Sequence, residues 1–218
     1  MWTIALVTQK GGSGKSTLAI GLAVAALQAG EQVYMLETDK QGTLTNWALR
    51  RSAEEPGVDR VNSGAELDRA LKLIAARGYT LAIIDTPGVD SVTVTAAIRA
   101  ADLCIIPARP SPADIEAANP TLDAIRKLGR PFAFVLNQAP SRSFRLSEAA
   151  TALNLWGVLA TPYVVQRNDH QDALGAGLAV SEFAPAGKAA EEIRALWVWI
   201  KKRLTVKEAK YDERRAAS

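Results

Sequence analysis

The sequence predicts an α/β fold in which a doubly wound, mostly parallel sheet is flanked by helices. Short apolar runs alternate along the chain with segments of helical period, which is the pattern of repeated strand–helix–strand units. Several of these runs lack polar alternation, as expected for parallel strands covered on both faces. A glycine-rich loop also joins the first run to the first helical segment, an order typical of phosphate-binding loops.

Six apolar runs are predicted as strands, at residues 4–7, 33–36, 81–84, 103–106, 132–136 and 163–165. The segments between and after them predict helices at 18–29, 43–52, 65–77, 92–100, 113–128, 144–153 and 188–204. Gly30 is expected to end the first helix, and Ser111 followed by Pro112 is expected to begin the fifth. In the last helix, apolar residues at i, i+3, i+4, i+7 and i+11 predict one face buried in the core. This apolar stripe consists of Ile193, Leu196, Trp197, Ile200 and Leu204.

The composition is that of an ordinary globular protein, with 48% hydrophobic and 22% charged residues in a chain of 218. We expect one domain over residues 1–204 and a basic, mobile tail over 205–218. No apolar run approaches the ~20 residues that span a bilayer, and the residues before the first strand do not predict a signal peptide, so a cytoplasmic location is expected. The single cysteine, Cys104, lies in an apolar run and is expected to be a buried thiol.

A loop at residues 10–17, with the sequence Lys-Gly-Gly-Ser-Gly-Lys-Ser-Thr, predicts a nucleotide-phosphate site. Its glycines allow consecutive amides to turn toward a polyphosphate, and the positive end of the following helix adds to the attraction. Lys15 is expected to reach the β- and γ-phosphates, and the Ser16 hydroxyl is expected to ligate Mg²⁺. The expected nucleotide-binding residues of the loop are Lys10, Gly11, Gly12, Ser13, Gly14, Lys15, Ser16 and Thr17.

The loop departs from the usual spacing, because Gln9 stands where a glycine is expected and a second lysine, Lys10, follows it. In this respect it resembles the deviant phosphate loop of the ParA/MinD family of P-loop ATPases. The resemblance covers nearly the whole chain, and it implies ATP and Mg²⁺ as cofactors. It also implies a homodimer that forms on ATP, in which Lys10 contacts the nucleotide of the facing subunit as a catalytic residue.

Two acidic segments resemble the switches of that family. Glu37 and Asp39 follow the second predicted strand, and a bound Mg²⁺ would offset these two neighbouring acids. By position, Asp39 matches the catalytic acid that holds or activates the attacking water, with Glu37 as the second candidate. Asp39 is also expected at the metal site, with Ser16 and Asp85. Lys40 replaces the family's proline, so this loop loses a fixed φ and gains a charge. Asp85 ends a buried strand and matches the acid that binds Mg²⁺ through water.

Two further side chains bear on the site. Asn137 follows the strand at 132–136 and resembles the family's adenine-reading asparagine. His170 has no companion at metal-ligand spacing and is expected at the surface, so no metal other than Mg²⁺ is predicted.

The resemblance implies an ATPase, slow alone, that binds nonspecific DNA as a dimer and segregates or positions a cargo. The cargo is a plasmid, a chromosome or a protein cluster, and a ParB-like adaptor protein is expected to stimulate hydrolysis near the nucleoid. From Lys201 onward there are seven basic and three acidic residues, which suggests contacts with DNA phosphates. The candidate DNA contacts are Arg142, Arg145, Lys201, Lys202 and Arg203. A membrane-cycling ATPase of the MinD kind and a small-molecule ligase of the same superfamily remain as alternatives.

Overall fold

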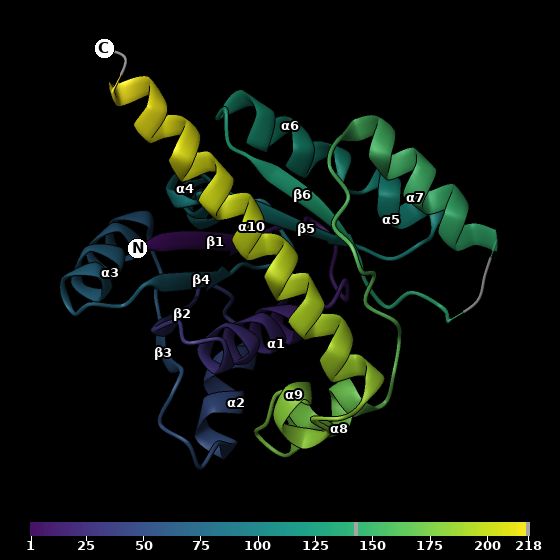
Figure 1. The fold of residues 1–218 in the computed structure, drawn as a ribbon, viewed down its shortest axis with the longest axis horizontal. Helices are drawn as coiled ribbons and strands as arrows, with labels where there is room; N and C mark the ends of the chain where they lie inside the picture. The colour runs from purple at the N-terminus through teal and green to yellow at the C-terminus, as the bar shows by residue number, and fades with distance from the viewer. Residues whose placement is uncertain (142–143, 217–218) are drawn as a thin grey trace.

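The computed structural model describes residues 1–141 and 144–216, and their side chains as far as residue 206. Its centre is a sheet of six parallel strands in the order β3-β2-β4-β1-β5-β6 (Figure 1). This confirms the predicted fold class. The strands are β1 (Trp2–Leu6), β2 (Val33–Glu37), β3 (Gly57–Arg60), β4 (Leu81–Asp85), β5 (Leu103–Ala108) and β6 (Phe132–Leu136).

Five of the six predicted strands are confirmed, and the sixth, at 163–165, is wrong. That segment makes only an isolated bridge, between Val165 and Ala139, because Ala139 already lies beyond the end of β6. The actual sixth strand, β3, was missed by the sequence analysis. It is an edge strand paired only with β2, and its four residues Gly-Val-Asp-Arg contain a single aliphatic side chain.

The helices cover both faces of the sheet (Figure 1). The helix predicted at 113–128 is divided, because Pro120 has no N–H to donate to the preceding turn. Two short helices, α8 and α9, were not predicted, and α10 continues through most of the expected tail. The helices are α1 (Lys15–Gln28), α2 (Thr43–Arg50), α3 (Gly64–Ala76), α4 (Val92–Ala100), α5 (Pro112–Glu116), α6 (Asn119–Lys127), α7 (Phe144–Trp156), α8 (Asp169–Gly175), α9 (Val180–Phe183) and α10 (Lys188–Ala216).

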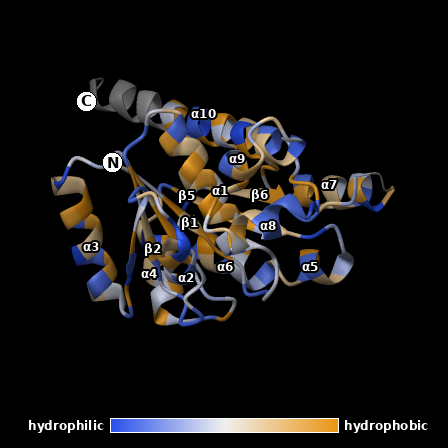
Figure 2. Cartoon of the chain, turned by 90° about the horizontal axis from the view of Figure 1, so that it is seen from below, coloured by the Kyte–Doolittle hydropathy of each residue, from blue (hydrophilic) through white to orange (hydrophobic). Residues whose placement is uncertain are grey.

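The sheet separates two hydrophobic cores. One lies under α1, α2, α9 and α10, and it contains the whole predicted stripe of the last helix. The other lies under α3, α4, α5, α6 and α7, and the buried thiol of Cys104 belongs to it. Figure 2 shows hydrophobic residues in the interior between α10 and the strands. Within the described part of the chain, the helices are all too short or too polar to span a bilayer.

The parallel register brings the ends of four strands to one edge of the sheet. Leu6 of β1 pairs with Asp85 of β4, Asp85 with Glu37 of β2, and Glu37 with Arg60 of β3. Two carboxylates and one guanidinium, which come from distant parts of the sequence, therefore stand in one row. The glycine loop follows β1 at this same edge.

Helix α2, which follows this edge, is fixed to the α8–α9 region. The indole nitrogen of Trp47 donates to the carbonyl oxygen of Leu178 at 3.1 Å. Arg51, directly after α2, makes two 2.7 Å hydrogen bonds to the carboxylate of Glu182 and stacks on Trp47, 4.9 Å from the ring centroid. These contacts fix the second half of α2 and its carboxyl end to the α8–α9 region.

Candidate nucleotide-binding site

The glycine loop between β1 and α1 is shaped to receive an anion. Gly12 and Gly14 adopt φ angles of +74° and +83°, in the left-handed region that glycine tolerates. A Cβ atom on Gly14 would lie 2.4 Å from the side-chain amide nitrogen of Asn137, so a larger residue there would require that side chain to move. No side chain caps α1, which leaves its first amides available to a phosphate group.

Lys15 lies beneath this loop, with 7% of its surface exposed. Its ammonium group donates to the carbonyl oxygens of Thr8 at 3.5 Å and of Lys10 at 3.4 Å. Burial lowers the pKa of Lys15, and the nearby carboxylates of Asp85 and Asp39 counteract part of that effect. A buried cation at this place is compatible with the predicted contact between Lys15 and the β- and γ-phosphates.

Asp85 is fully buried at the end of β4 and accepts a 2.6 Å hydrogen bond from the Ser16 hydroxyl. Its second carboxylate oxygen, Oδ1, is buried and has no partner among the described residues. Burial raises the pKa of Asp85 to about 7, against the opposing influence of Ser16 and Lys15. A divalent cation nearby would favour the ionised form.

This pair of oxygen-bearing side chains fits Mg²⁺. Mg²⁺ is bound in proteins by one or two oxygen ligands, with waters and phosphate oxygens completing its shell. In the described ranges there is no cluster of three or more acidic, histidine or cysteine side chains that could hold a metal ion. Ser16 would hold the ion directly, and the unpartnered oxygen of Asp85 would hold its water shell.

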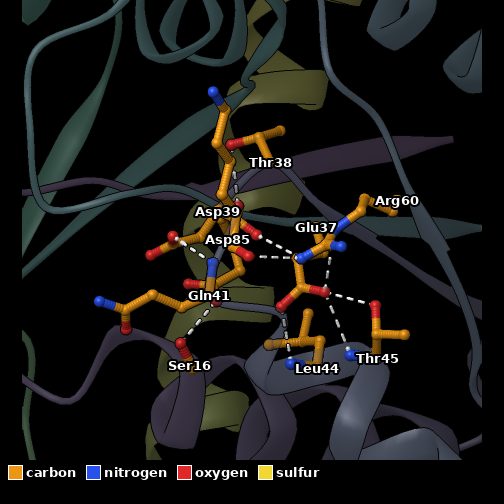
Figure 3. Close-up of polar contacts among 10 residues, drawn as sticks. Ser16, Glu37, Thr38, Asp39, Gln41, Leu44, Thr45, Arg60 and Asp85 are labelled. Atoms are coloured by element: carbon orange, nitrogen blue, oxygen red, sulfur yellow. Dashed lines mark hydrogen bonds and ion pairs between the residues drawn. The ribbon is translucent and has the colours of Figure 1, made fainter.

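Glu37 and Asp39 have separate environments. Glu37 is fully buried and accepts hydrogen bonds from the main-chain nitrogens of Leu44 at 2.8 Å and Thr45 at 3.2 Å, and from the Thr45 hydroxyl (Figure 3). It therefore caps the amino end of α2, where a negative charge is stabilised. The expectation that Mg²⁺ offsets both acids is wrong for Glu37, because α2 already does so. Its position in the cap also argues against Glu37 as the second catalytic candidate.

Asp39 lies in the loop at residues 38–42, which we call the first switch loop. One of its carboxylate oxygens accepts a 2.9 Å hydrogen bond from the main-chain nitrogen of Gln41. Asp39 lines a cleft of about 640 Å³ together with Lys15, Ser16 and Gly88. A Cβ atom on Gly88 would lie 3.1 Å from the main-chain nitrogen of Gly11, so the loop at 86–88 closely approaches the glycine loop. Asp39 thus borders the same cleft as the groups predicted to bind phosphate.

A second, smaller cavity of about 120 Å³ adjoins the cleft, since Gly14 and Thr17 line both. Asn137 borders it, but its amide nitrogen donates to the carbonyl oxygen of Ser13 at 2.8 Å, so it braces the glycine loop. Gln138 makes a similar 2.9 Å contact with Gly12. The glycine loop therefore packs against the segment that follows β6.

His170 also lines this cavity, which corrects the expectation that it lies at the surface. Its ring is partly buried, and its Nε2 atom has no partner within the described part of the protein. Burial lowers the pKa of His170, although Glu192 and Asp169 oppose the shift. The sequence gives no signal for this placement, because α8 reaches the cavity only through tertiary packing.

The candidate DNA contacts lie in separate places. Arg142 is outside the described residues, and Arg145 is exposed on α7. Lys201 pairs with Glu31 at 2.5 Å, while Arg203 stacks on Trp199 at 5.3 Å from the ring centroid. Because Glu31 precedes β2, these basic residues of α10 stand near the amino edge of the strands, opposite the nucleotide cleft.

Comparison with known proteins agrees with a nucleotide-binding site at the glycine loop. The model of the "CobQ/CobB/MinD/ParA nucleotide binding domain" family matches residues 4–180. The chain is 32% identical to the maintenance of carboxysome distribution protein A of Gloeobacter kilaueensis, over 88% of each sequence. It is 30% identical to protein ParA of Rhizobium radiobacter, over 77% of this chain and 79% of that protein. The fold is similar to MinD of Pyrococcus horikoshii complexed with Mg-ADP, with a TM-score of 0.75, 18% identity, and coverage of 94% of this chain and 98% of that one.

Proposed function

Because the chain belongs to the CobQ/CobB/MinD/ParA family of nucleotide-binding domains, we propose that it is an ATPase that dimerises on ATP and positions a cargo. The observation that supports this best is the set of buried Lys15, half-buried Ser16 and buried Asp85 at one edge of the sheet, in which Ser16 donates to Asp85. Asp39 borders the same cleft from a loop, where it can act on the outermost phosphate.

We assign the following roles in hydrolysis. The amides of the glycine loop and Lys15 bind the β- and γ-phosphates, and Ser16 and Asp85 hold the Mg²⁺ shell. Mg²⁺, when bound, neutralises charge that develops on the phosphates. Asp39 orients the attacking water, and Lys10 contributes a cation to the nucleotide of the facing subunit. Asn137 and His170 border the space that would receive the base.

The names of two relatives indicate the class of cargo that we propose. The relative from Gloeobacter kilaueensis is named for carboxysome distribution, and the relative from Rhizobium radiobacter is named ParA. We therefore propose a large cargo, such as a protein body or a DNA molecule, that an adaptor protein links to the ATPase. The adaptor would stimulate hydrolysis, and nonspecific DNA of the nucleoid would serve as the track.

The first prediction tests the dimer. Only the main-chain carbonyl of Lys10 contacts Lys15, so Lys10→Ala keeps that contact and removes the side-chain charge alone. Wild-type protein should sediment as a dimer with Mg²⁺-ATP and as a monomer with ADP. Lys10→Ala should still bind ATP but hydrolyse it roughly 10- to 100-fold more slowly, because a charge-assisted contact contributes about 1.5–3 kcal/mol.

Lys72→Ala is the matched control, since this lysine is exposed on α3. It should dimerise and hydrolyse ATP like the wild type. If Lys10→Ala also hydrolyses ATP at the wild-type rate, Lys10 has no role across a subunit boundary and the sandwich dimer loses its support.

The second prediction concerns the affinity of the protein for DNA, which is measured by gel shifts at a series of salt concentrations. Only the ATP dimer should bind well, because two subunits together neutralise more phosphates. Unrelated sequences should bind alike, and the log–log salt slope should be about −0.9 for each duplex phosphate contacted. Lys202→Ala and Arg203→Ala should each reduce the slope, whereas Lys201→Ala should change it less because Glu31 already neutralises that charge.

Arg145→Ala tests the alternative patch on α7. If Arg145→Ala is the one variant with a shallower log–log salt dependence of DNA affinity, the DNA contacts lie on α7 and not on α10. Binding that is absent, or equal with ATP, ADP and no nucleotide, would contradict DNA as the track and favour a membrane or protein surface.

A further inference from the structure

Arg60, the last residue of the edge strand β3, holds the first switch loop by its main chain. One guanidinium nitrogen, Nη2, donates to the carbonyl oxygen of Lys40 at 2.7 Å and to that of Asp39 at 3.3 Å. A guanidinium presents its donors in a fixed plane, so two carbonyls bound to it are held in a defined relation. The catalytic candidate Asp39 is therefore one of the two residues that Arg60 restrains.

The surroundings of Arg60 are adapted to this contact. The Arg60 Nε atom lies 4.0 Å from the Glu37 carboxylate, which is buried and fixed in the cap of α2 (Figure 3). Gly42 has a φ of +72°, and a Cβ atom at this position would lie 2.9 Å from Arg60 Nη2. The glycine thus leaves room for the guanidinium, while the Glu37 carboxylate faces the Nε side of this half-exposed side chain.

Between its two ends, the first switch loop has two hydrogen bonds of its own among the described residues, besides those of Arg60. The Gln41 main-chain nitrogen donates to the Asp39 carboxylate at 2.9 Å, and the Gly42 nitrogen donates to the Asp39 carbonyl oxygen at 3.3 Å. At one end, Thr38 continues β2 through a 2.9 Å hydrogen bond from its main-chain nitrogen to the main-chain carbonyl oxygen of Asp85. At the other end, Glu37 and Trp47 fix α2. Lys40 in the middle is exposed and has no proline ring to fix its φ angle. The contacts of Arg60 are made at this middle part of the loop.

We propose that Arg60 is a positioning residue for hydrolysis, which sets the place of the Asp39 carboxylate by holding the carbonyls of Asp39 and Lys40. This inference rests on the proposed ATPase function. Arg60 does not act on ATP itself, and its effect passes through Asp39. Arg60 should therefore influence the rate of the chemical step and leave the affinity for ATP almost unchanged.

The experiment measures steady-state ATP hydrolysis in a double-mutant cycle of Arg60→Ala and Asp39→Ala, with ATP affinity from calorimetry. Arg60→Ala should lower kcat by roughly 10- to 100-fold, the size expected when a catalytic group is displaced by about 1 Å. The KM should stay near that of the wild type. In the Asp39→Ala background, Arg60→Ala should cause no further loss, because the group that it positions is gone.

Arg69→Ala is the matched control, since Arg69 is an exposed arginine on the neighbouring helix α3. Arg60→Lys, which keeps the charge but lacks the planar fork, should lie between the wild type and Arg60→Ala, and it replaces Arg60→Ala in the cycle if that variant does not fold. Equal rates for Arg60→Ala and Arg69→Ala, or the same loss with and without Asp39, would overturn the inference. A wild-type protein without ATPase activity would instead contradict the proposed function.

Discussion

Replacement of Asp39 by alanine is expected to slow ATP hydrolysis by a factor on the order of 10²–10⁴ while ATP-driven dimers persist. The carboxylate borders the phosphate cleft and contacts only the neighbouring main chain at Gln41 among the hydrogen bonds described for it. Its removal therefore takes away the group that orients water without disturbing the packing of the core. Single-turnover hydrolysis and sedimentation with Mg²⁺-ATP measure the two effects separately.

Glu37→Gln provides the contrasting variant. Glu37 is buried in the cap of α2, so its substitution should lower the melting temperature more than Asp39→Ala does. If Asp39→Ala hydrolyses ATP at the wild-type rate, the attacking water is oriented by another group and the assignment of Asp39 fails.

Replacement of Lys15 by alanine is expected to reduce ATP affinity by roughly 10²–10⁴-fold, below what calorimetry detects at ordinary protein concentrations. Two charge-assisted hydrogen bonds to phosphate oxygens contribute about 1.5–3 kcal/mol each, which gives about 3–6 kcal/mol in total. The lysine also bridges the carbonyl oxygens of Thr8 and Lys10, so the empty loop loses an internal brace as well.

Circular dichroism should show that Lys15→Ala retains the fold, because the two hydrophobic cores do not depend on this side chain. Lys72→Ala again serves as the control and should bind ATP normally. Unchanged ATP binding by Lys15→Ala would remove the assignment of the glycine loop as the phosphate site.

The sequence predicted the strands that carry continuous apolar runs, and it predicted the glycine loop, because both are local patterns. The edge strand Gly57–Arg60 escaped prediction, since Val58 alone among its residues is aliphatic, and with it Arg60 was missed. Glu37 and Asp39 look alike in the sequence, as two acids at i and i+2. Only the packing of α2 onto the end of β2 separates a capping carboxylate from one that faces the cleft.

His170 was misjudged for a related reason. Its neighbours in the cavity include Gly14 and Asn137, which are distant from it in the sequence. The local sequence around His170 does not predict that these residues line one cavity, because their proximity depends on how α8 packs. The roles of Lys10, Asp39 and the DNA contacts depend on bound partners, so they remain predictions for experiment.

The course of α10 has a practical consequence for experiments in living cells. The helix begins near the nucleotide end of the molecule, and the ion pair between Lys201 and Glu31 fixes its later turns to the opposite side (Figure 1). A fluorescent protein fused after α10 would therefore project away from the nucleotide cleft and from any subunit that closes over it. Such a fusion would leave the cleft open, but it would lie on the same helix as the candidate DNA contacts Lys202 and Arg203, so DNA binding by the tagged protein is to be compared with that of the untagged protein.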